Sequence, residues 1–398
     1  MSEEFRLRSI ALTAYGPSSL AAIGYGATAA VLPLLARDLG ASVHLAATVI
    51  GLAALGPLVG SLPAGALVAR VGERRALVAA GIVEAAATAA TAIVPTLWLF
   101  LLTILVSNLA WTVFLLARQG YMIDAVPPAL RARALSALGG THRIGMLIGP
   151  LLGAVLIGGW GIRAPFLLAA VTSLAAAGLA LTMPDLSALA RAEHGDTTLR
   201  EVLARHRWVL ATLGTSVIVI SGTRAIRAVL VPLWAEHVGL GAELISVIVA
   251  VSVGVEILLF YPAGWIMDHH GRFWVAVTCV GLMSVGFAAL ALAHGAWAVL
   301  AVSVLIGIGN GLGSGVVMTL GADSAPVRGR SQFLGAWRTC GEAGQVGGPL
   351  VLAALAAVAP LAAAVVLTGL VTLAGAGWVG YWVHRAAGRP SPPAEPIS

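Results

Sequence analysis

The chain contains no lysine, few charges and only two cysteines. Charged residues make up 10% of its 398 residues, against 59% hydrophobic residues, and the mean hydropathy is +0.96. No stretch carries enough charge to cover a water-facing surface, which excludes a soluble globular protein. Cys279 and Cys340 lie in different apolar segments, so the sequence indicates neither a disulfide framework nor a metal site.

Side chains arranged for catalysis are also lacking. We find no nucleophile–base or metal-ligand set at a usable spacing, and therefore expect no enzyme activity, no metal and no cofactor. The net charge of +6 comes from arginines in loops between apolar segments, which does not favour a nucleic-acid partner. Acidic residues at the start, MSEEFRLRS, precede a full-length apolar segment, so we expect no removable signal peptide.

Long apolar segments are what the sequence does contain. A helix needs about 20 apolar residues to cross the roughly 30 Å hydrocarbon core of a bilayer. Segments of this kind recur in two sets of six, which predicts an all-α membrane protein with twelve transmembrane helices. The predicted spans cover residues 12–36, 45–69, 76–94, 97–122, 134–158, 164–183, 208–235, 244–267, 273–293, 296–322, 333–357 and 360–384.

The second half of the chain repeats the first at a constant offset of 199 residues. Pro63-Ala-Gly65 returns as Pro262-Ala-Gly264, and Gly149-Pro150 returns as Gly348-Pro349. One offset over such distances predicts two homologous six-helix bundles, an organisation typical of transporters with a site between the repeats. We predict bundles at 1–183 and 208–384, a cytoplasmic linker at 184–207 and a disordered cytoplasmic tail at 385–398.

Arginine indicates the orientation. All 23 basic residues are arginines, and most lie at the termini or in loops that follow even-numbered spans, whereas Arg37 and Arg163 lie on the other side. Cytoplasmic loops carry the positive excess, so we expect both termini in the cytoplasm. Thr198 and Glu201 in the linker have the spacing of a capping box, which predicts a short surface helix.

Two loops carry a family resemblance. GALVARVGERR at 65–75 lies between the second and third spans, and GWIMDHHGR at 264–272 occupies the equivalent place in the second half. Both resemble the loop signature of the major facilitator superfamily, and their glycines allow a tight turn at the membrane face. These glycines are Gly65, Gly72, Gly264 and Gly271. The resemblance covers essentially the whole chain and implies a transporter with a six-plus-six helix fold.

The first loop departs from this signature. Ala69 stands where the family usually has an acidic residue, whereas Asp268 keeps that residue in the second half. The resemblance implies that this carboxylate helps to hold a cytoplasmic gate shut. An anion near the N-terminus of a facing helix is favoured by about 0.3–1 kcal/mol. We therefore expect Asp268 to face the start of the fifth span; the alternative is a solvated loop residue.

A second motif lies in the fifth span and is echoed in the eleventh. Its residues are Gly145, Gly149, Pro150 and Gly153, with Gly348 and Pro349 in the second copy. Glycines four residues apart leave a smooth face for a partner helix, and proline removes one backbone donor. The first copy resembles the motif of drug–proton antiporters within the superfamily, which favours export. The alternative is plain helix packing.

Glu256 and Arg224 lie deep within the eighth and seventh spans. An ionisable side chain at the bilayer midplane costs about 2.5 kcal/mol or more unless it faces a cavity or a partner. Because the two spans are neighbours in sequence, we predict an Arg224–Glu256 pair that responds to protons. The alternative is a static pair that holds two helices together.

The fifth and eleventh spans add another charged set. Arg338 and Glu342 are spaced i, i+4 and are expected to pair on one helical face. Arg143 corresponds to Glu342 by the offset, which predicts an attraction across the halves in one conformational state. The alternative is that Arg338 occupies Glu342 and leaves Arg143 for substrate. Glu342 is the second proton-coupling candidate, and His142 is expected to be packed.

The resemblance places spans one, four, seven and ten around a central cavity. Together with Arg143 and Arg338, the candidate substrate residues are Tyr25, Asn108, Trp111, Arg224, Arg227 and Asn310. Aromatic rings and amides suit an amphipathic molecule of moderate size. The first span has no embedded carboxylate, which argues against a dedicated cation pump and leaves neutral or anionic substrates open. Glu84 lies deep in the third span, where packing is as good an interpretation as function.

Three functions are compatible with these observations. The leading one is a secondary active transporter, a proton-coupled exporter of a small organic molecule in the cytoplasmic membrane of a bacterium. The second is an importer of a sugar or organic acid with the same fold. The third is a membrane sensor that does not transport. The expected partners are a small-molecule substrate, protons and the lipid bilayer, and no oligomer is required.

Overall fold

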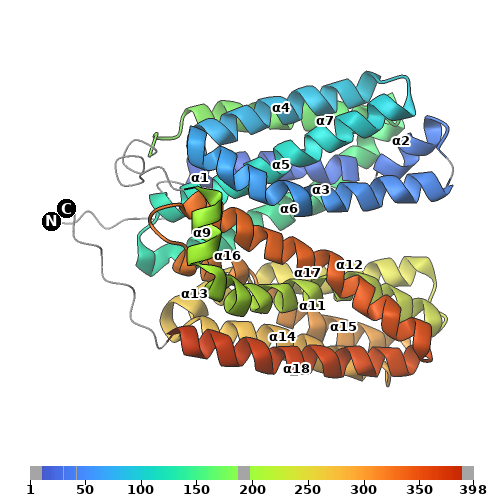
Figure 1. Ribbon diagram of the computed structural model, residues 1–398. Helices are drawn as coiled ribbons and strands as arrows, with labels where there is room; N and C mark the ends of the chain where they lie inside the picture. Colours follow the sequence, from blue (N-terminus) through green and yellow to red (C-terminus); the bar gives the residue numbers. More distant parts are fainter. Residues whose placement is uncertain (1–10, 30, 42, 187–197, 388–398) are drawn as a thin grey trace.

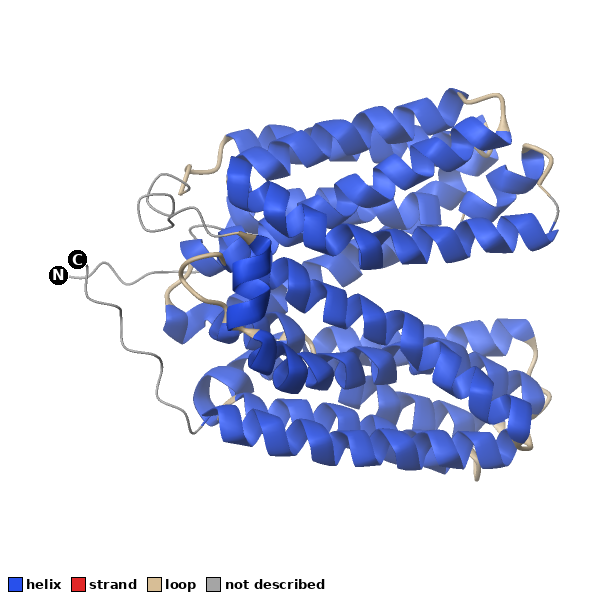
Figure 2. Ribbon diagram, in the orientation of Figure 1, coloured by secondary structure: helices blue, strands red, loops and turns tan. Residues whose placement is uncertain are grey.

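The computed structural model describes residues 11–186 and 198–387, apart from residues 30 and 42. Within this part of the chain the structure consists of helices and short loops and contains no strand (Figure 2). The helices from α1 to α7 lie together in one bundle, and those from α11 to α18 lie together in a second (Figure 1). The segments 187–197 and 388–398, which include most of the predicted tail, lie outside the described residues.

The first bundle contains α1 (Ala11–Ala29), α2 (Leu32–Asp38), α3 (Val43–Val71), α4 (Glu73–Ile93), α5 (Leu97–Ala125), the short η2 (Pro128–Leu130), α6 (Arg131–Trp160) and α7 (Ala164–Leu181). The connecting segment contributes α9 (Leu199–Arg205), α10 (Arg207–Val209) and the π-helical turn η3 (Leu210–Gly214). The second bundle contains α11 (Thr215–His237), α12 (Ala242–Leu258), α13 (Phe260–His270), α14 (Arg272–Leu290), α15 (Ala296–Leu312), α16 (Val316–Ser324), α17 (Arg330–Val358) and α18 (Leu361–Ala387).

The fold class predicted from the sequence is confirmed. Each of the twelve predicted spans corresponds to one helix or to two or three consecutive helical segments. Among the described residues, nine helices are long and apolar enough to cross a membrane by themselves, and a bent pair makes ten. The chain is an all-α, multi-pass membrane protein.

Two spans break where the backbone cannot continue a regular helix. Between α12 and α13 the axis bends by 41°. Pro262 has no N–H to donate to the carbonyl four residues earlier, and the Leu259 N–H turns instead to the Glu256 carbonyl at 3.2 Å. Between α15 and α16, Gly315 adopts φ 78°, a left-handed conformation that favours glycine. A Cβ at Gly315 would lie 2.4 Å from the Ser136 Oγ, so α16 contacts α6 closely there.

The internal repeat is visible in the backbone as well as in the sequence. Gly72 and its counterpart Gly271 have φ values of 86° and 88°, and Gly40 and Gly239 have 87° and 83°. Only glycine adopts these angles at low cost, so each loop signature needs its glycine at the turn. The two halves therefore turn the chain in the same way at equivalent points.

Glycines of the second motif let helices pack at backbone distance. A Cβ at Gly149 would lie 2.4 Å from the Ile23 carbonyl oxygen of α1. In the second half, a Cβ at Gly348 would lie 2.3 Å from the Gly222 carbonyl oxygen of α11. Both copies of the motif therefore hold the first helix of a bundle against its fifth, with Pro150 and Pro349 inside α6 and α17.

The connecting segment contains the predicted surface helix. Thr198 accepts a hydrogen bond from the Glu201 N–H at 3.3 Å, and the Glu201 carboxylate accepts one from the Thr198 N–H at 3.0 Å. This reciprocal capping box starts α9, which packs against α17. In Figure 1, α9 lies at the left end of the molecule, next to α17.

Candidate functional site

Two helix pairs related by the repeat form the main contacts between the two bundles. α3 packs against α17, and α6 packs against α13. A Cβ at Gly65 would lie 2.6 Å from the Ser331 carbonyl oxygen, and a Cβ at Gly264 would lie 2.8 Å from the Arg133 Cα. The first glycine of each loop signature thus allows contact across the halves. These contacts lie at the end of the molecule where α9 is drawn, here called the closed end, and the bundles diverge toward the other end (Figures 1 and 2).

Asp268 lies at one of these contacts. Its Oδ2 accepts hydrogen bonds from the Arg133 backbone N–H at 3.3 Å and from the Arg133 Nε at 2.8 Å. Arg133 is in the first turn of α6, so the carboxylate faces the positive end of a helix from the other half. The Asp268 side chain is 3% exposed, which makes it a buried contact between the halves and not a solvated loop residue.

Other charged contacts surround this closed end. Arg330 at the start of α17 pairs with Asp124 at the end of α5, across the halves. Ser331 donates to the Glu73 carboxylate at 3.2 Å, also across the halves. Within the second half, the Arg272 Nε donates to Asp323 at 2.7 Å. Asp124 and Asp323 are repeat equivalents, but Asp124 forms its ion pair across the halves, whereas Asp323 forms its ion pair with Arg272 of its own half.

A cavity of about 270 Å³ lies between the bundles and is lined by residues of both halves. Its wall is formed by α5, α6, α11, α16 and α17 with the turn before α16. The polar lining residues are Arg118, Gln119, His142, Arg143, Ser221, Arg224, Ser314, Arg338, Glu342 and Gln345. The cavity thus combines four arginines with one carboxylate, a strongly basic lining for a site inside a membrane protein.

Four of the predicted site residues line this cavity together: Arg143, Arg224, Arg338 and Glu342. Arg118 also lines it, and this residue was not predicted from the sequence, because it lies near the end of its predicted span, residues 97–122. An arginine inside an apolar segment was the available signal. The structure contains the i, i+4 pair, in which the Arg338 Nη2 donates to Glu342 at 2.7 Å.

The partners of Glu256 differ from the prediction. Its carboxylate pairs with Arg227 on α11 and with Arg143 on α6, and its side chain is 5% exposed. Arg224 instead donates from Nε to the Asn310 Oδ1 at 2.6 Å. The predicted Arg224–Glu256 pair is therefore wrong, because the face of α11 that carries Arg227 is turned toward α12.

The attraction between Arg143 and Glu342, predicted for one conformational state, is not made in the described state. Arg143 reaches Glu256 in the other half, and Glu342 is paired with Arg338 on its own helix. Arg143 therefore does link the two halves, with a different carboxylate. Its guanidinium carbon also lies 4.9 Å from the centre of the Phe260 ring, a cation–π contact with α13.

The predicted aromatic and amide residues lie behind the cavity wall. Tyr25 and Trp111 stack with ring centroids 4.6 Å apart, and Trp111 lies 5.8 Å from the His142 ring. The Asn108 amide donates to the Ile104 carbonyl of its own helix at 2.9 Å. These three predicted residues, and Arg227 and Asn310, do not line the cavity. Two of the five contact lining residues, namely Asn310 at Arg224 and Trp111 at His142.

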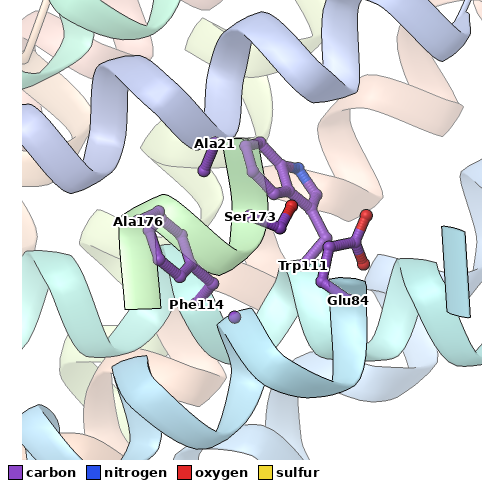
Figure 3. A pocket seen from close by; sticks show the side chains of 7 residues that line it. Ala21, Glu84, Trp111, Phe114, Ser173 and Ala176 are labelled. Atoms are coloured by element: carbon purple, nitrogen blue, oxygen red, sulfur yellow. The ribbon is translucent and has the colours of Figure 1, made fainter. Parts of the chain in front are cut away.

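Glu84 lies inside the first bundle. It borders a small cavity of about 10 Å³ beside Trp111 and Ser173 (Figure 3). Its Oε1 accepts a hydrogen bond from Ser107 at 2.9 Å, and its buried Oε2 has no hydrogen-bond partner among the described residues. This carboxylate is separate from the cavity between the halves.

Comparison with known proteins identifies the family. The profile of the Major Facilitator Superfamily matches residues 18–223 and 212–397, so the chain belongs to this family of transporters. None of the curated proteins is significantly similar to it in sequence.

Solved structures share the fold at low sequence identity. FucP in the outward conformation aligns with a TM-score of 0.79 and 13% identity over 94% of this chain and 98% of its own. The proton:xylose symporter XylE aligns with a TM-score of 0.75 and 14% identity, over 95% of this chain and 97% of its own. The human organic anion transporter MFSD10 aligns with a TM-score of 0.73 and 15% identity, over 94% of this chain and 99% of its own.

Proposed function

We propose that the protein is a proton-coupled secondary active transporter that exports a small organic molecule by alternating access. The observation that carries this proposal is a polar cavity between two repeated bundles that touch each other at one end. Rocking of the bundles would break the contacts at that end and form equivalent ones at the other. One chain contains the whole cavity, so the proposal requires no oligomer.

The arginine pattern gives this movement a direction in the membrane. It places the loop signatures, and hence the closed end, in the cytoplasm, so the described state is outward-facing in our proposal. We infer a bacterial inner membrane with both termini inside. Cysteines at Ser187 and Ser391, both outside the described residues, should resist a membrane-impermeant thiol reagent added to intact cells. Efficient labelling of either would contradict this topology.

Coupling to protons is proposed to occur at Glu256. This carboxylate is shared by Arg227 of its own half and Arg143 of the other half. A proton bound to the carboxylate removes the negative charge that holds Arg143, which loosens one contact between the halves. Removing one partner of a buried ion pair typically costs about 3–5 kcal/mol, enough to shift a conformational equilibrium. Glu342 is less suited to this role, because its partner Arg338 lies on the same helix.

Export rests on the resemblance of the Gly145–Gly153 motif to that of drug–proton antiporters. A second candidate, uptake, is favoured by one observation, namely that XylE and the fucose transporter FucP are described as proton symporters. Both candidates use the same cavity and the same carboxylate. They differ in whether the proton and the substrate move in opposite directions or in the same direction.

Vesicles of opposite orientation separate these candidates. In everted vesicles with an acidic interior, an exported substrate should dissipate the pH gradient, as read by a pH-sensitive dye. In right-side-out vesicles with an acidic exterior, an imported substrate should accumulate. Counterflow in proteoliposomes at equal pH tests transport itself, since a sensor that does not transport exchanges nothing. Absence of counterflow for every compound of a broad panel would refute the proposed function.

A further inference from the structure

Arg118 is the least neutralised charge of the cavity. The residue is 5% exposed, and its Nε and Nη1 are fully buried without a hydrogen-bond partner among the described residues. The other three arginines of the lining each contact an acceptor: Arg143 at Glu256, Arg224 at Asn310 and Arg338 at Glu342. A buried guanidinium without an acceptor destabilises the protein, because an unsatisfied hydrogen-bonding group costs more free energy when it is charged than when it is neutral.

The donors next to Arg118 lack acceptors as well. Arg338 and His142 lie close enough to Arg118 to interact with it electrostatically. The Arg338 Nε and the His142 Nδ1 are both buried without a hydrogen-bond partner among the described residues. All three side chains line the same cavity. Side chains from α5, α6 and α17 therefore meet at one cavity, and each of them keeps a buried polar nitrogen without a hydrogen-bond partner among the described residues.

We propose that this cluster is an anion-binding centre and that the transported substrate is an organic anion. A carboxylate, sulfonate or phosphate monoester would accept hydrogen bonds from the planar fork of Arg118, with Arg338 adding a second positive charge. This inference rests on the proposed transport function and names the substrate class of the same cavity. A cation would meet like charges at Arg118, Arg143, Arg224 and Arg338, which disfavours it.

The rest of the wall suits an apolar body attached to the anionic group. Leu115, Val317, Met318 and Trp337 line the cavity beside the arginines. The volume of about 270 Å³ is slightly below the range of about 300–1,000 Å³ for pockets that hold drug-sized ligands, so a smaller molecule is expected. A small aromatic or branched aliphatic acid fits this combination of size, apolar wall and basic anchor.

The test compares anions with neutral compounds of the same shape. Purified protein in proteoliposomes is assayed for binding and for counterflow with aromatic and aliphatic carboxylates, sulfonates and phosphate monoesters, each beside its neutral amide or ester. Inorganic phosphate and an anionic lipid are added as competitors. We expect at least one organic anion to bind and exchange, with its neutral analogue at least about tenfold weaker, the loss associated with one charge-assisted hydrogen bond.

Arg118→Gln identifies the anchor. It should raise the Kd of that anion by about ten- to a hundredfold, whereas Arg200→Gln should not change it, because exposed Arg200 lies on α9 outside the cavity. If Arg118→Gln does not fold, Arg118→Lys serves instead, since it keeps the charge and removes the fork. Its expected effect is smaller.

Other experimental results would contradict the anion class, the Arg118 anchor, the organic substrate or transport itself. Counterflow of neutral or cationic compounds alone would overturn the anion proposal and leave the transport function intact. Equal binding in Arg118→Gln and the wild type would overturn the anchor. Competition by inorganic phosphate or anionic lipid at the strength of the best organic anion, without exchange of any organic anion, would show a site for those groups and refute the organic substrate. Absence of counterflow for every compound would refute transport itself.

Discussion

The contact between Asp268 and Arg133 should control how long the closed end of the protein stays closed. Its carboxylate is buried and accepts two hydrogen bonds from a residue of the other half. Both are lost when the halves separate at this end, so the contact stabilises one conformational state and not the other. Asp268→Asn keeps the shape and one acceptor oxygen but removes the charge.

The size of the effect follows from the hydrogen bonds. A hydrogen bond to a charged group contributes about 1.5–3 kcal/mol and a neutral one about 0.5–1.5 kcal/mol, so the substitution should cost the closed end about 1–2 kcal/mol. This range includes the loss of the favourable interaction between the Asp268 charge and the N-terminus of α6. The ratio of the two states should then change by about five- to thirtyfold. Turnover should slow, and the protein should still reach the membrane.

The reverse substitution is available in the first half. Ala69 occupies the position equivalent to Asp268 on α3, which packs against α17 as α13 packs against α6. Ala69→Asp places a carboxylate near the N-terminus of α17, an interaction of about 0.3–1 kcal/mol. The ratio of the state with this end closed to the state with it open should therefore increase by about two- to fivefold.

Distances between spin labels measure these populations. Trp98 and Trp297 are repeat equivalents at the starts of α5 and α15, at the far end, with 81% and 83% exposure. Labels there, after replacement of Cys279 and Cys340 by alanine, should show a long distance in the described state. Asp268→Asn should shift weight toward a shorter distance, and Ala69→Asp toward the longer one. Unchanged distributions and unchanged transport in both variants would show that the loop signature is structural here.

Three further predictions concern coupling, packing and the linker. Glu256→Gln should lower pH-driven transport by at least about tenfold yet permit exchange at equal pH, with Glu342→Gln as the control. Normal pH-driven transport in Glu256→Gln would refute the role of Glu256 and favour Glu342 as the coupling residue. Gly149→Ala should lower stability by about 1–3 kcal/mol, seen as a lower Tm in detergent, because its Cβ meets the α1 backbone. Gly158→Ala, which meets no atom within 4 Å, should have little effect, and equal Tm values would contradict the packing argument. Burial and the nearby Arg205 lower the pKa of His206 below 6.5, so below that pH the unfolded chain binds a proton that the folded linker does not. Stability should therefore decrease as the pH falls below 6.5, and His206→Gln should weaken this decrease; an identical pH profile of Tm in the variant would refute it.

The features that the sequence determined by itself depend on a single helix or turn and not on how helices pack. Span length and apolar content are fixed by the thickness of a bilayer, so twelve spans were readable without a structure. The turn glycines Gly72 and Gly271 were readable because positive φ excludes most other residues. The Arg338–Glu342 pair was readable because one helix sets its i, i+4 geometry.

Contacts between helices required the tertiary structure. Arg224 and Arg227 are three residues apart on α11 and point to neighbouring faces, so the rotation of that helix decides which of them reaches Glu256. Hydropathy does not encode this rotation, because both faces of α11 pack against protein. The second partner, Arg143, comes from the other half, and only the docking of the two bundles brings it to Glu256. The same docking surrounds Arg118 with other donors, which sequence spacing along α5 does not reveal.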